Sequence, residues 1–147
     1  MKAWRIANRK FNMLEGAGGR YVGGRWHSAG RPIVYLAEHP ALAALEVLVH
    51  MDMAMADLPE YLLLKVDVPD TVEIRVIDCD PLQSDKTVAA GNRWLASGET
   101  ALCRVPSAVM PHSYNYLLNP AHPDAATARI EEEMSFAFDA RLFRWRA

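Results

Sequence analysis

The sequence predicts an α+β fold, a single domain with a mixed sheet flanked by helices. Its 147 residues are the length of one ordinary domain. A composition of 51% hydrophobic and 23% charged residues is typical of a globular core rather than a disordered chain. Strand-like runs outnumber helical ones and alternate with them imperfectly, which favours an α+β arrangement. We therefore expect residues 1–147 to form one unit.

The first third of the chain predicts two strands and a helix around a glycine-rich stretch. Apolar runs at 4–7 and 33–37 predict the strands. Pro40 suits the first turn of a helix that extends to about Met53. Because glycine is costly in helices and strands, we expect 16–30 to be irregular. The glycines of this stretch are Gly16, Gly18, Gly19, Gly23, Gly24 and Gly30.

The rest of the chain predicts four more strands, one helix and an ambiguous tail. The tail alternates apolar residues on one face, which favours a strand, with an acidic helix through Glu131, Glu132 and Glu133 as the alternative. Gly98 is expected to end the helix as a C-terminal cap. The predicted strands are 61–68, 72–78, 101–105 and 114–118, the helix is 86–97, and the tail is 130–138.

Charge and cysteine content exclude several classes of protein. Sixteen basic and eighteen acidic residues give a net charge of -2 and a pI near 6.2, whereas proteins that grip phosphate backbones carry a basic surplus. Cys79 and Cys103 are too few for a disulfide scaffold or a four-cysteine zinc site. No signal-peptide or membrane-spanning run is visible. We expect a cytoplasmic protein with reduced thiols, no membrane segment and no direct nucleic-acid contact.

Several common catalytic motifs are missing from the sequence. The five histidines show no metal-binding spacing, so we expect no metal. Arg25-Trp26 stands where a phosphate-binding P-loop needs Lys-Ser/Thr, and Tyr21 stands where a dinucleotide-binding motif needs its third glycine. The sequence therefore does not support a P-loop or Rossmann site.

The glycine-rich stretch nevertheless offers groups that suit an anionic, ring-containing ligand. Glycine lets backbone approach a ligand closely, and Arg25 presents a planar fork of donors to phosphate or carboxylate. Tyr21 and Trp26 add flat surfaces for a ring. The alternative is a flexible surface loop with solvated arginines.

Glu46 is the most informative single residue of the sequence. It is the only formally charged side chain from Pro40 to Met51, and it falls within the apolar stripe of the predicted helix. Burying an unpaired carboxylate costs on the order of several kcal/mol, so the presence of Glu46 in this stripe needs a reason. It either pairs with His50 or an arginine for stability, or serves a site that stabilises positive charge. The stripe consists of Leu42, Leu45, Val49 and Met53.

Ser107 follows a predicted strand that ends at Pro106, where the chain turns at the sheet edge. It is a candidate site residue, although a turn serine is the alternative. No Gly-x-Ser-x-Gly elbow surrounds it, which argues against a hydrolase nucleophile. Asn115 and Asn119 are interpreted as turn or backbone-bonding residues.

Taken in order, these residues resemble the RES-domain family, the toxins of RES–Xre toxin–antitoxin modules. The family is named for an arginine, a glutamate and a serine, which this chain has in that order. The resemblance covers nearly the whole chain, and its motifs are specific only as an ordered set. Where the family often has asparagine after the Arg-Trp pair, this chain has His27. The motifs are Trp4-Arg5, Gly23-Gly24-Arg25-Trp26, Val34-Tyr35, Ala43–His50, Val105-Pro106-Ser107, Asn115–Pro120 and Phe136–Leu142.

The resemblance implies a fold similar to the diphtheria-toxin-like ADP-ribosyltransferases and a pocket for NAD as substrate. By this analogy Arg25, helped by Arg5, holds the diphosphate or its neighbouring ribose, and Tyr35 stacks on nicotinamide. Glu46 binds ribose hydroxyls and stabilises the developing oxocarbenium charge, while Ser107 orients Glu46 or the ribose. The expected catalytic residues are thus Glu46, Arg25 and Ser107, and the expected NAD-binding residues are Arg5, Tyr35 and Arg25.

The implied activity is cleavage of the nicotinamide–ribose bond, which degrades NAD by hydrolysis or phosphorolysis. One alternative is ADP-ribosylation of a protein such as phosphoribosyl pyrophosphate synthetase. An enzyme acting on a phosphorylated sugar and a non-catalytic interaction domain are two others. The implied partner is an Xre-type helix-turn-helix antitoxin that blocks the pocket and carries the DNA binding. The apolar helix and phenylalanine-rich tail also leave room for a homo-oligomer within the antitoxin complex.

Overall fold

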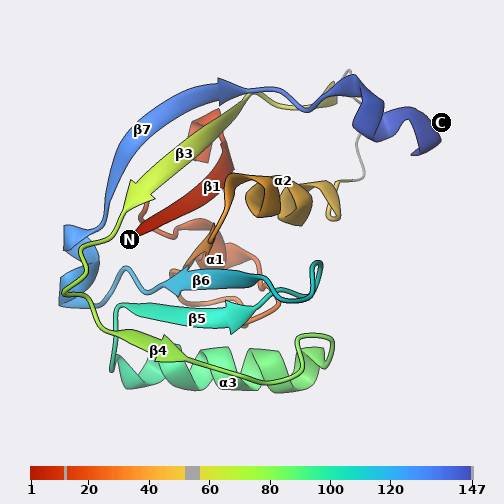
Figure 1. Ribbon diagram of the computed structural model, residues 1–147. Helices are drawn as coiled ribbons and strands as arrows, with labels where there is room; N and C mark the ends of the chain where they lie inside the picture. The colour runs from red at the N-terminus through yellow and green to blue at the C-terminus, as the bar shows by residue number, and fades with distance from the viewer. Residues whose placement is uncertain (12, 52–56, 147) are drawn as a thin grey trace.

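Seven strands form one mixed sheet in the computed structural model, which describes residues 1–11, 13–51 and 57–146 (Figure 1). Their order across the sheet is β4-β5-β6-β2-β1-β3-β7. Strands β4 and β5 pair in parallel, and the other pairs are antiparallel. The strands are β1 (Lys2–Asn8), β2 (Val34–Ala37), β3 (Tyr61–Asp67), β4 (Ile74–Val76), β5 (Leu102–Pro106), β6 (Tyr114–Leu118) and β7 (Arg129–Phe136).

Two α-helices longer than one turn accompany the sheet within the described residues. Helix α2 (Pro40–Leu48) begins directly after β2, with Pro40 in its first turn and the His39 ring accepting the Ala41 N–H as an N-cap. Helix α3 (Ser84–Ser97) ends at Gly98, whose φ of 61° is the left-handed conformation that glycine adopts readily. The shorter elements are α1 (Gly18–Tyr21) and the 3₁₀ turns η1 (Arg9–Phe11), η3 (Pro123–Thr127) and η4 (Ala140–Arg146).

Helices α2 and α3 cover neighbouring parts of the same face of the sheet. Leu42 and Ala43 of α2 pack with Ile6 and Ala37, whereas α3 packs on the inward residues of β5 and β6. Ala37 lies opposite Asn115, and two residues along, Tyr35 lies opposite Leu117. Because residues two apart share a face, all four point toward the helices.

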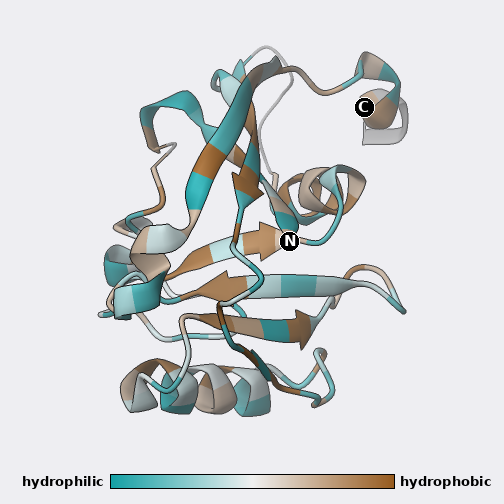
Figure 2. Cartoon of the chain, turned by 60° about the vertical axis from the view of Figure 1, so that its left-hand side comes forward, coloured by the Kyte–Doolittle hydropathy of each residue, from teal (hydrophilic) through white to brown (hydrophobic). Residues whose placement is uncertain are grey.

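The opposite face of the sheet holds the largest hydrophobic core. It is formed by alternate residues of the central strands. Figure 2 shows hydrophobic segments, in brown, along the strands of the sheet. Its fully buried members include Val34, Leu64, Val66, Leu102 and Leu118. The two faces of the sheet therefore differ. The face opposite the helices forms one continuous hydrophobic core, and on the other face polar groups can meet between α2 and α3.

Most predicted elements are confirmed, with differences at their ends. The tail is a strand, β7, rather than an acidic helix. The glycine-rich stretch is not wholly irregular, because Gly18–Tyr21 forms one helical turn. Helix α2 ends at Leu48, earlier than predicted, because the following N–H groups of His50 and Met51 turn back to carbonyls only three residues away. Met53 lies outside the described residues.

Strand β4 is three residues long instead of the predicted seven, because it pairs only at Ile74–Val76 along the sheet edge. Within the described ranges, no helix is long and apolar enough to cross a bilayer.

Candidate active site

Glu46, Ser107 and Asn115 form a hydrogen-bonded cluster on the helix-covered face of the sheet. The Ser107 hydroxyl donates to Glu46 Oε1 at 2.8 Å, and the Asn115 amide Nδ2 donates to the same oxygen at 2.7 Å. Glu46 comes from the second half of α2, Ser107 from the residue after β5, and Asn115 from β6. Helix α2 and the β5–β6 hairpin, which are distant in sequence, thus meet at one carboxylate oxygen.

The turn after β5 determines which way the Ser107 hydroxyl points. Ser107 Oγ accepts the backbone N–H groups of Val109 and Met110 at 3.1 and 3.2 Å. Its own N–H donates to the Ser113 carbonyl at 2.9 Å, which closes the loop between β5 and β6. Because two donors already occupy the oxygen, the hydroxyl hydrogen is directed at Glu46.

No cation neutralises Glu46 among the described residues. The ion pairs of this part of the chain do not include it, so pairing with His50 or an arginine is not how its charge is accommodated. Its partners are a hydroxyl and an amide, both neutral, and both bond Oε1. Oε2 receives no hydrogen bond from the described residues and is available to a ligand. The Glu46 side chain is half-buried.

A second cluster connects Tyr35 to the glycine-rich segment. His27, which is buried, has Nε2 3.2 Å from the Gly19 carbonyl and Nδ1 2.7 Å from the Tyr35 hydroxyl. A carbonyl only accepts, so Nε2 carries the proton and Nδ1 accepts from Tyr35. The Tyr35 oxygen in turn accepts the Trp26 N–H at 3.2 Å. Burial raises the pKa of Tyr35 to about 12, and the hydroxyl therefore stays protonated at neutral pH.

Arg25 lies at the tip of a tight turn next to Tyr35. The Gly24 N–H bonds the His27 carbonyl at 3.0 Å, and a methyl group on Gly24 would lie 2.6 Å from the Tyr35 hydroxyl. The exposed Arg25 side chain donates one bond, from Nη1 to the Pro81 carbonyl at 2.7 Å. Its remaining donors have no partner among the described residues and can meet an anionic ligand.

Helix α3 fixes this turn in place. The Thr87 hydroxyl donates to the Arg25 carbonyl at 2.5 Å, and Asn92 exchanges hydrogen bonds with Ser28. A Cβ on Gly91 would lie 1.6 Å from the Trp26 carbonyl oxygen, so only glycine permits this approach. The backbone of the Arg25 turn is therefore anchored to α3.

The register of β2 and β6 brings the two clusters together. Tyr35 lies opposite Leu117, and Asn115 lies opposite Ala37, so Tyr35 and Asn115 are diagonal neighbours on one face. Diagonal neighbours in antiparallel pairs are typically about 7–8 Å apart, within reach of long side chains. The Glu46 cluster and Tyr35 thus lie on the same face of the sheet, with the Arg25 turn next to Tyr35.

Arg5 is not brought to these clusters. It alternates with Trp4 and Ile6 on β1 and shares the face of Ala3 and Ala7, which belong to the opposite core. Its Nε is buried and has no hydrogen-bond partner, and burial lowers the pKa of the guanidinium. The assignment of Arg5 to substrate binding stays a prediction that none of these contacts supports.

Sequence reasoning missed several residues that build the site. Asn115 was interpreted as a turn or backbone-bonding residue, but its amide bonds Glu46. His27 and Gly91 went unassigned, although a glycine in the middle of a predicted helix was a usable signal of close packing. Cys103 is fully buried, and burial raises the pKa of its thiol to about 12.

The described residues contain no metal-binding cluster, and two surface hollows among them lie away from Glu46. Within the described residues, no group of three or more His, Cys, Asp or Glu side chains could hold a metal ion. Two surface hollows lie elsewhere, one between β4 and α3 and the other between the ends of β3 and β7.

Fold and site together define a small α+β protein whose mixed sheet presents an uncompensated carboxylate beside a tyrosine and an exposed arginine. The RES domain model matches residues 2–139. Toxin Res of Pseudomonas putida is 45% identical over 97% of this chain and 100% of its own length. The Prs ADP-ribosylating toxin of a Sphingobium species is 37% identical over 96% of each chain. The chain belongs to the RES domain family.

A solved structure shares the fold. The Mycobacterium tuberculosis MbcT–MbcA toxin–antitoxin complex contains a chain that superposes with a TM-score of 0.72 at 17% identity, covering 92% of this chain and 84% of that one. The predicted α+β class and the predicted family are both confirmed.

Proposed function

We propose that this protein is the toxin of a toxin–antitoxin pair and that it cleaves the nicotinamide–ribose bond of NAD. Family membership and the relatives named Toxin Res support the first part. The site geometry supports the second. The same reasoning makes the protein an enzyme with NAD as its substrate.

The observation that carries the proposal is the state of Glu46. Breaking the nicotinamide–ribose bond develops positive charge on the ribose, and a fixed carboxylate stabilises that charge more than the ground state. Glu46 is held by two neutral donors on Oε1 and keeps Oε2 open. A carboxylate already neutralised by a lysine or arginine could not do this.

The neighbouring groups suit the remaining parts of NAD. The Arg25 guanidinium has free donors for the diphosphate, and the half-buried Tyr35 ring offers a flat surface to nicotinamide. Ser107 acts by orienting Glu46. Arg5 would take part only if the ligand reached the other face of the sheet.

In the proposed reaction, the C–N bond between ribose and nicotinamide breaks and its electron pair leaves with nicotinamide. The cationic pyridinium thereby becomes neutral nicotinamide, and the ribose becomes an oxocarbenium ion opposite Glu46. An acceptor oxygen then bonds to the ribose carbon and, in the case of water, releases one proton. Water gives ADP-ribose, and inorganic phosphate gives a phosphorylated ADP-ribose.

A protein side chain is the second candidate acceptor, which would make this chain an ADP-ribosyltransferase. The name of the Sphingobium relative, a Prs ADP-ribosylating toxin, favours this variant. The MbcT–MbcA complex likewise supports an antitoxin as partner. We propose an antitoxin of the helix-turn-helix type, which would supply the DNA binding that an acidic toxin lacks.

The deciding experiment incubates purified, antitoxin-free protein with NAD and follows the products by mass spectrometry, with and without phosphate. Nicotinamide with ADP-ribose indicates hydrolysis, and nicotinamide with a phosphorylated ADP-ribose indicates phosphorolysis. Labelling of a protein in a lysate indicates transfer. If folded protein releases no nicotinamide and labels no protein, the enzymatic proposal fails, and a non-catalytic domain or an enzyme for another phosphorylated sugar takes its place.

A further inference from the structure

We propose that Asn115 is a positioning residue that, together with Ser107, holds the Glu46 carboxylate ionised and turns its second oxygen toward the substrate. This inference rests on the proposed function of Glu46. It gives a role to a side chain that the sequence alone suggested was a turn residue.

The backbone of Asn115 is held on both sides. It pairs with Ala37 of β2 and with Val105 of β5, so β6 is an inner strand at this residue. The side chain is half-buried and donates Nδ2 to Glu46 Oε1 at 2.7 Å, a short bond typical of an ionised acceptor. The direction of the amide is unambiguous, because an ionised carboxylate can only accept.

Both donors bond one oxygen, and this asymmetry is what positions the carboxylate. With Oε1 held from β6 and from the turn after β5, rotation of the Glu46 carboxylate would break two hydrogen bonds at once. Oε2 is left without a donor from the described residues. The Ser107 and Asn115 donors therefore stabilise the negative charge of Glu46 without neutralising it. A lysine in place of Asn115 would neutralise it.

Tyr35 shares this face, and its raised pKa of about 12 keeps it protonated at neutral pH, while the exposed Arg25 lies in the turn next to it. The following titratable groups are turned away or exposed. On α2 and its ends these are the exposed His39 and His50, and at the end of β2 it is Glu38, which accepts the Tyr114 N–H. Arg5, Arg104, Tyr114 and Tyr116 alternate onto the opposite face of β1, β5 and β6. A charge introduced at position 115 would therefore act directly on Glu46.

The test replaces Asn115 by aspartate, which keeps the shape and changes the charge. Two carboxylates at this separation cannot both ionise freely, so they share a proton. In N115D we expect the acidic limb of the pH–rate profile for nicotinamide release to move up by about one pH unit or more. Turnover at neutral pH should fall roughly 10-fold to 100-fold, the loss expected when one hydrogen bond to a charged group is removed.

N115A is the second variant, in case N115D does not fold. It should lower turnover by a similar factor and move the acidic limb upward by less than N115D does, because it removes a donor to Glu46 without adding a negative charge. The matched control is N8D, because Asn8 is another half-buried asparagine, at the end of β1 and not among the hydrogen-bond partners of Glu46. Its oxygen accepts the Lys10 N–H and would still do so as aspartate. N8D should match the wild type in turnover and pH profile.

A readout that needs no turnover separates this inference from the proposed function. The Glu46 carboxyl carbon is followed by ¹³C NMR against pH, with E46Q used to assign the signal. Its titration midpoint should lie at higher pH in N115D than in the wild type and N8D. If wild type releases no nicotinamide, the proposed function fails while the NMR titration still decides the role of Asn115. Folded N115D and N115A with wild-type turnover and an unmoved midpoint would overturn the inference.

Discussion

Replacing Glu46 by glutamine tests whether this residue acts in catalysis or only stabilises the fold. Glutamine keeps an acceptor oxygen for the Ser107 hydroxyl and the Asn115 amide, which now bond Oε1 at 2.8 and 2.7 Å. It removes the charge and puts an amide nitrogen where Oε2 was. No cation loses a partner, since no ion pair to Glu46 exists among the described residues.

The two expected effects of this change differ in size. A hydrogen bond to a charged acceptor contributes about 1.5–3 kcal/mol against about 0.5–1.5 for a neutral one, so the two bonds together lose about 2 kcal/mol. Relief of the cost of partly burying a charge at Glu46 opposes this loss. At roughly 2–4 °C per kcal/mol, the melting temperature should change by less than about 5 °C. Loss of one electrostatic group aimed at the transition state lowers turnover by roughly 10²-fold or more.

The assay measures nicotinamide release and thermal melting on the same preparation of wild type and E46Q. The matched control is E38Q, since Glu38 is an exposed carboxylate whose Oε1 accepts the Tyr114 N–H at 2.9 Å, a bond that glutamine preserves. E38Q should keep full turnover. Turnover of E46Q within a few-fold of wild type, together with a melting temperature lower by about 10 °C or more, would refute the catalytic reading.

Three further predictions follow from the turn and the sheet edge. R25A should weaken NAD binding by about one to two decades in calorimetry while melting like wild type, because the exposed guanidinium leaves no cavity. G91A should melt well below wild type and lose activity, because its methyl group would collide with the Trp26 carbonyl. K2M should flatten the fall of melting temperature below about pH 5. The Lys2 hydrogen bond lowers the pKa of Asp67 in the folded protein, so this pair contributes stability above the pKa that Asp67 has in the unfolded chain. That stability is lost as the pH falls through the pKa of Asp67 in the folded protein, and K2M removes it at every pH.

For each of these three predictions, a specific result would contradict it. An R25A variant that unfolds while wild type is stable would show that Arg25 is structural. G18A is the control for G91A, since a Cβ on Gly18 meets nothing within 4 Å, and equal melting of the two variants would contradict the close approach of α3. A K2M variant whose acid sensitivity equals that of wild type would show that the edge ion pairs do not affect stability.

Local patterns in the sequence were enough to predict the elements and the odd position of Glu46. Alternation identified β7, glycine at 98 identified the end of α3, and an isolated charge in an apolar helix identified Glu46. These signals depend on neighbours within a turn or a strand. The one-turn helix α1 was missed because glycine propensity is overridden by tertiary contacts, such as the Ile33 N–H bond to the Gly16 carbonyl.

The partners of Glu46 could not be predicted in the same way. Asn115 reaches Glu46 only because β6 pairs with β2 in a register that turns Asn115 to the same face as Ala37. A shift of one residue would send it to the opposite core. No pattern within the Asn115 segment fixes that register, which depends on pairing between strands about eighty residues apart.

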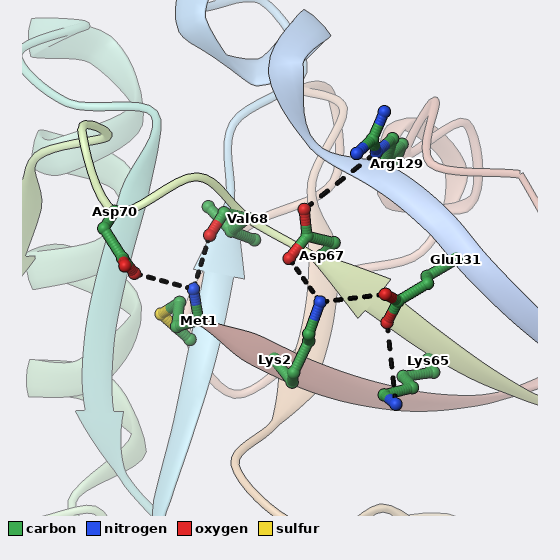
Figure 3. Close-up of polar contacts among 8 residues, drawn as sticks. All are labelled: Met1, Lys2, Lys65, Asp67, Val68, Asp70, Arg129 and Glu131. Carbon is green, nitrogen blue, oxygen red and sulfur yellow. Dashed lines mark hydrogen bonds and ion pairs between the residues drawn. The ribbon is translucent and has the colours of Figure 1, made fainter.

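The handling of carboxylates elsewhere on the sheet shows why the environment of Glu46 points to function. Along β1, β3 and β7, Lys2 bonds Asp67 at 2.6 Å and Glu131 at 3.0 Å, and Lys65 lies 3.6 Å from Glu131 (Figure 3). The chain thus places cations beside the half-buried Asp67 and the exposed Glu131. At Glu46, which is half-buried like Asp67, it supplies two neutral donors instead. Selection for stability alone would favour a cation beside Glu46 as well, because partly burying an uncompensated charge is costly. The negative charge of Glu46 is therefore best explained by a positive charge that arrives with the substrate.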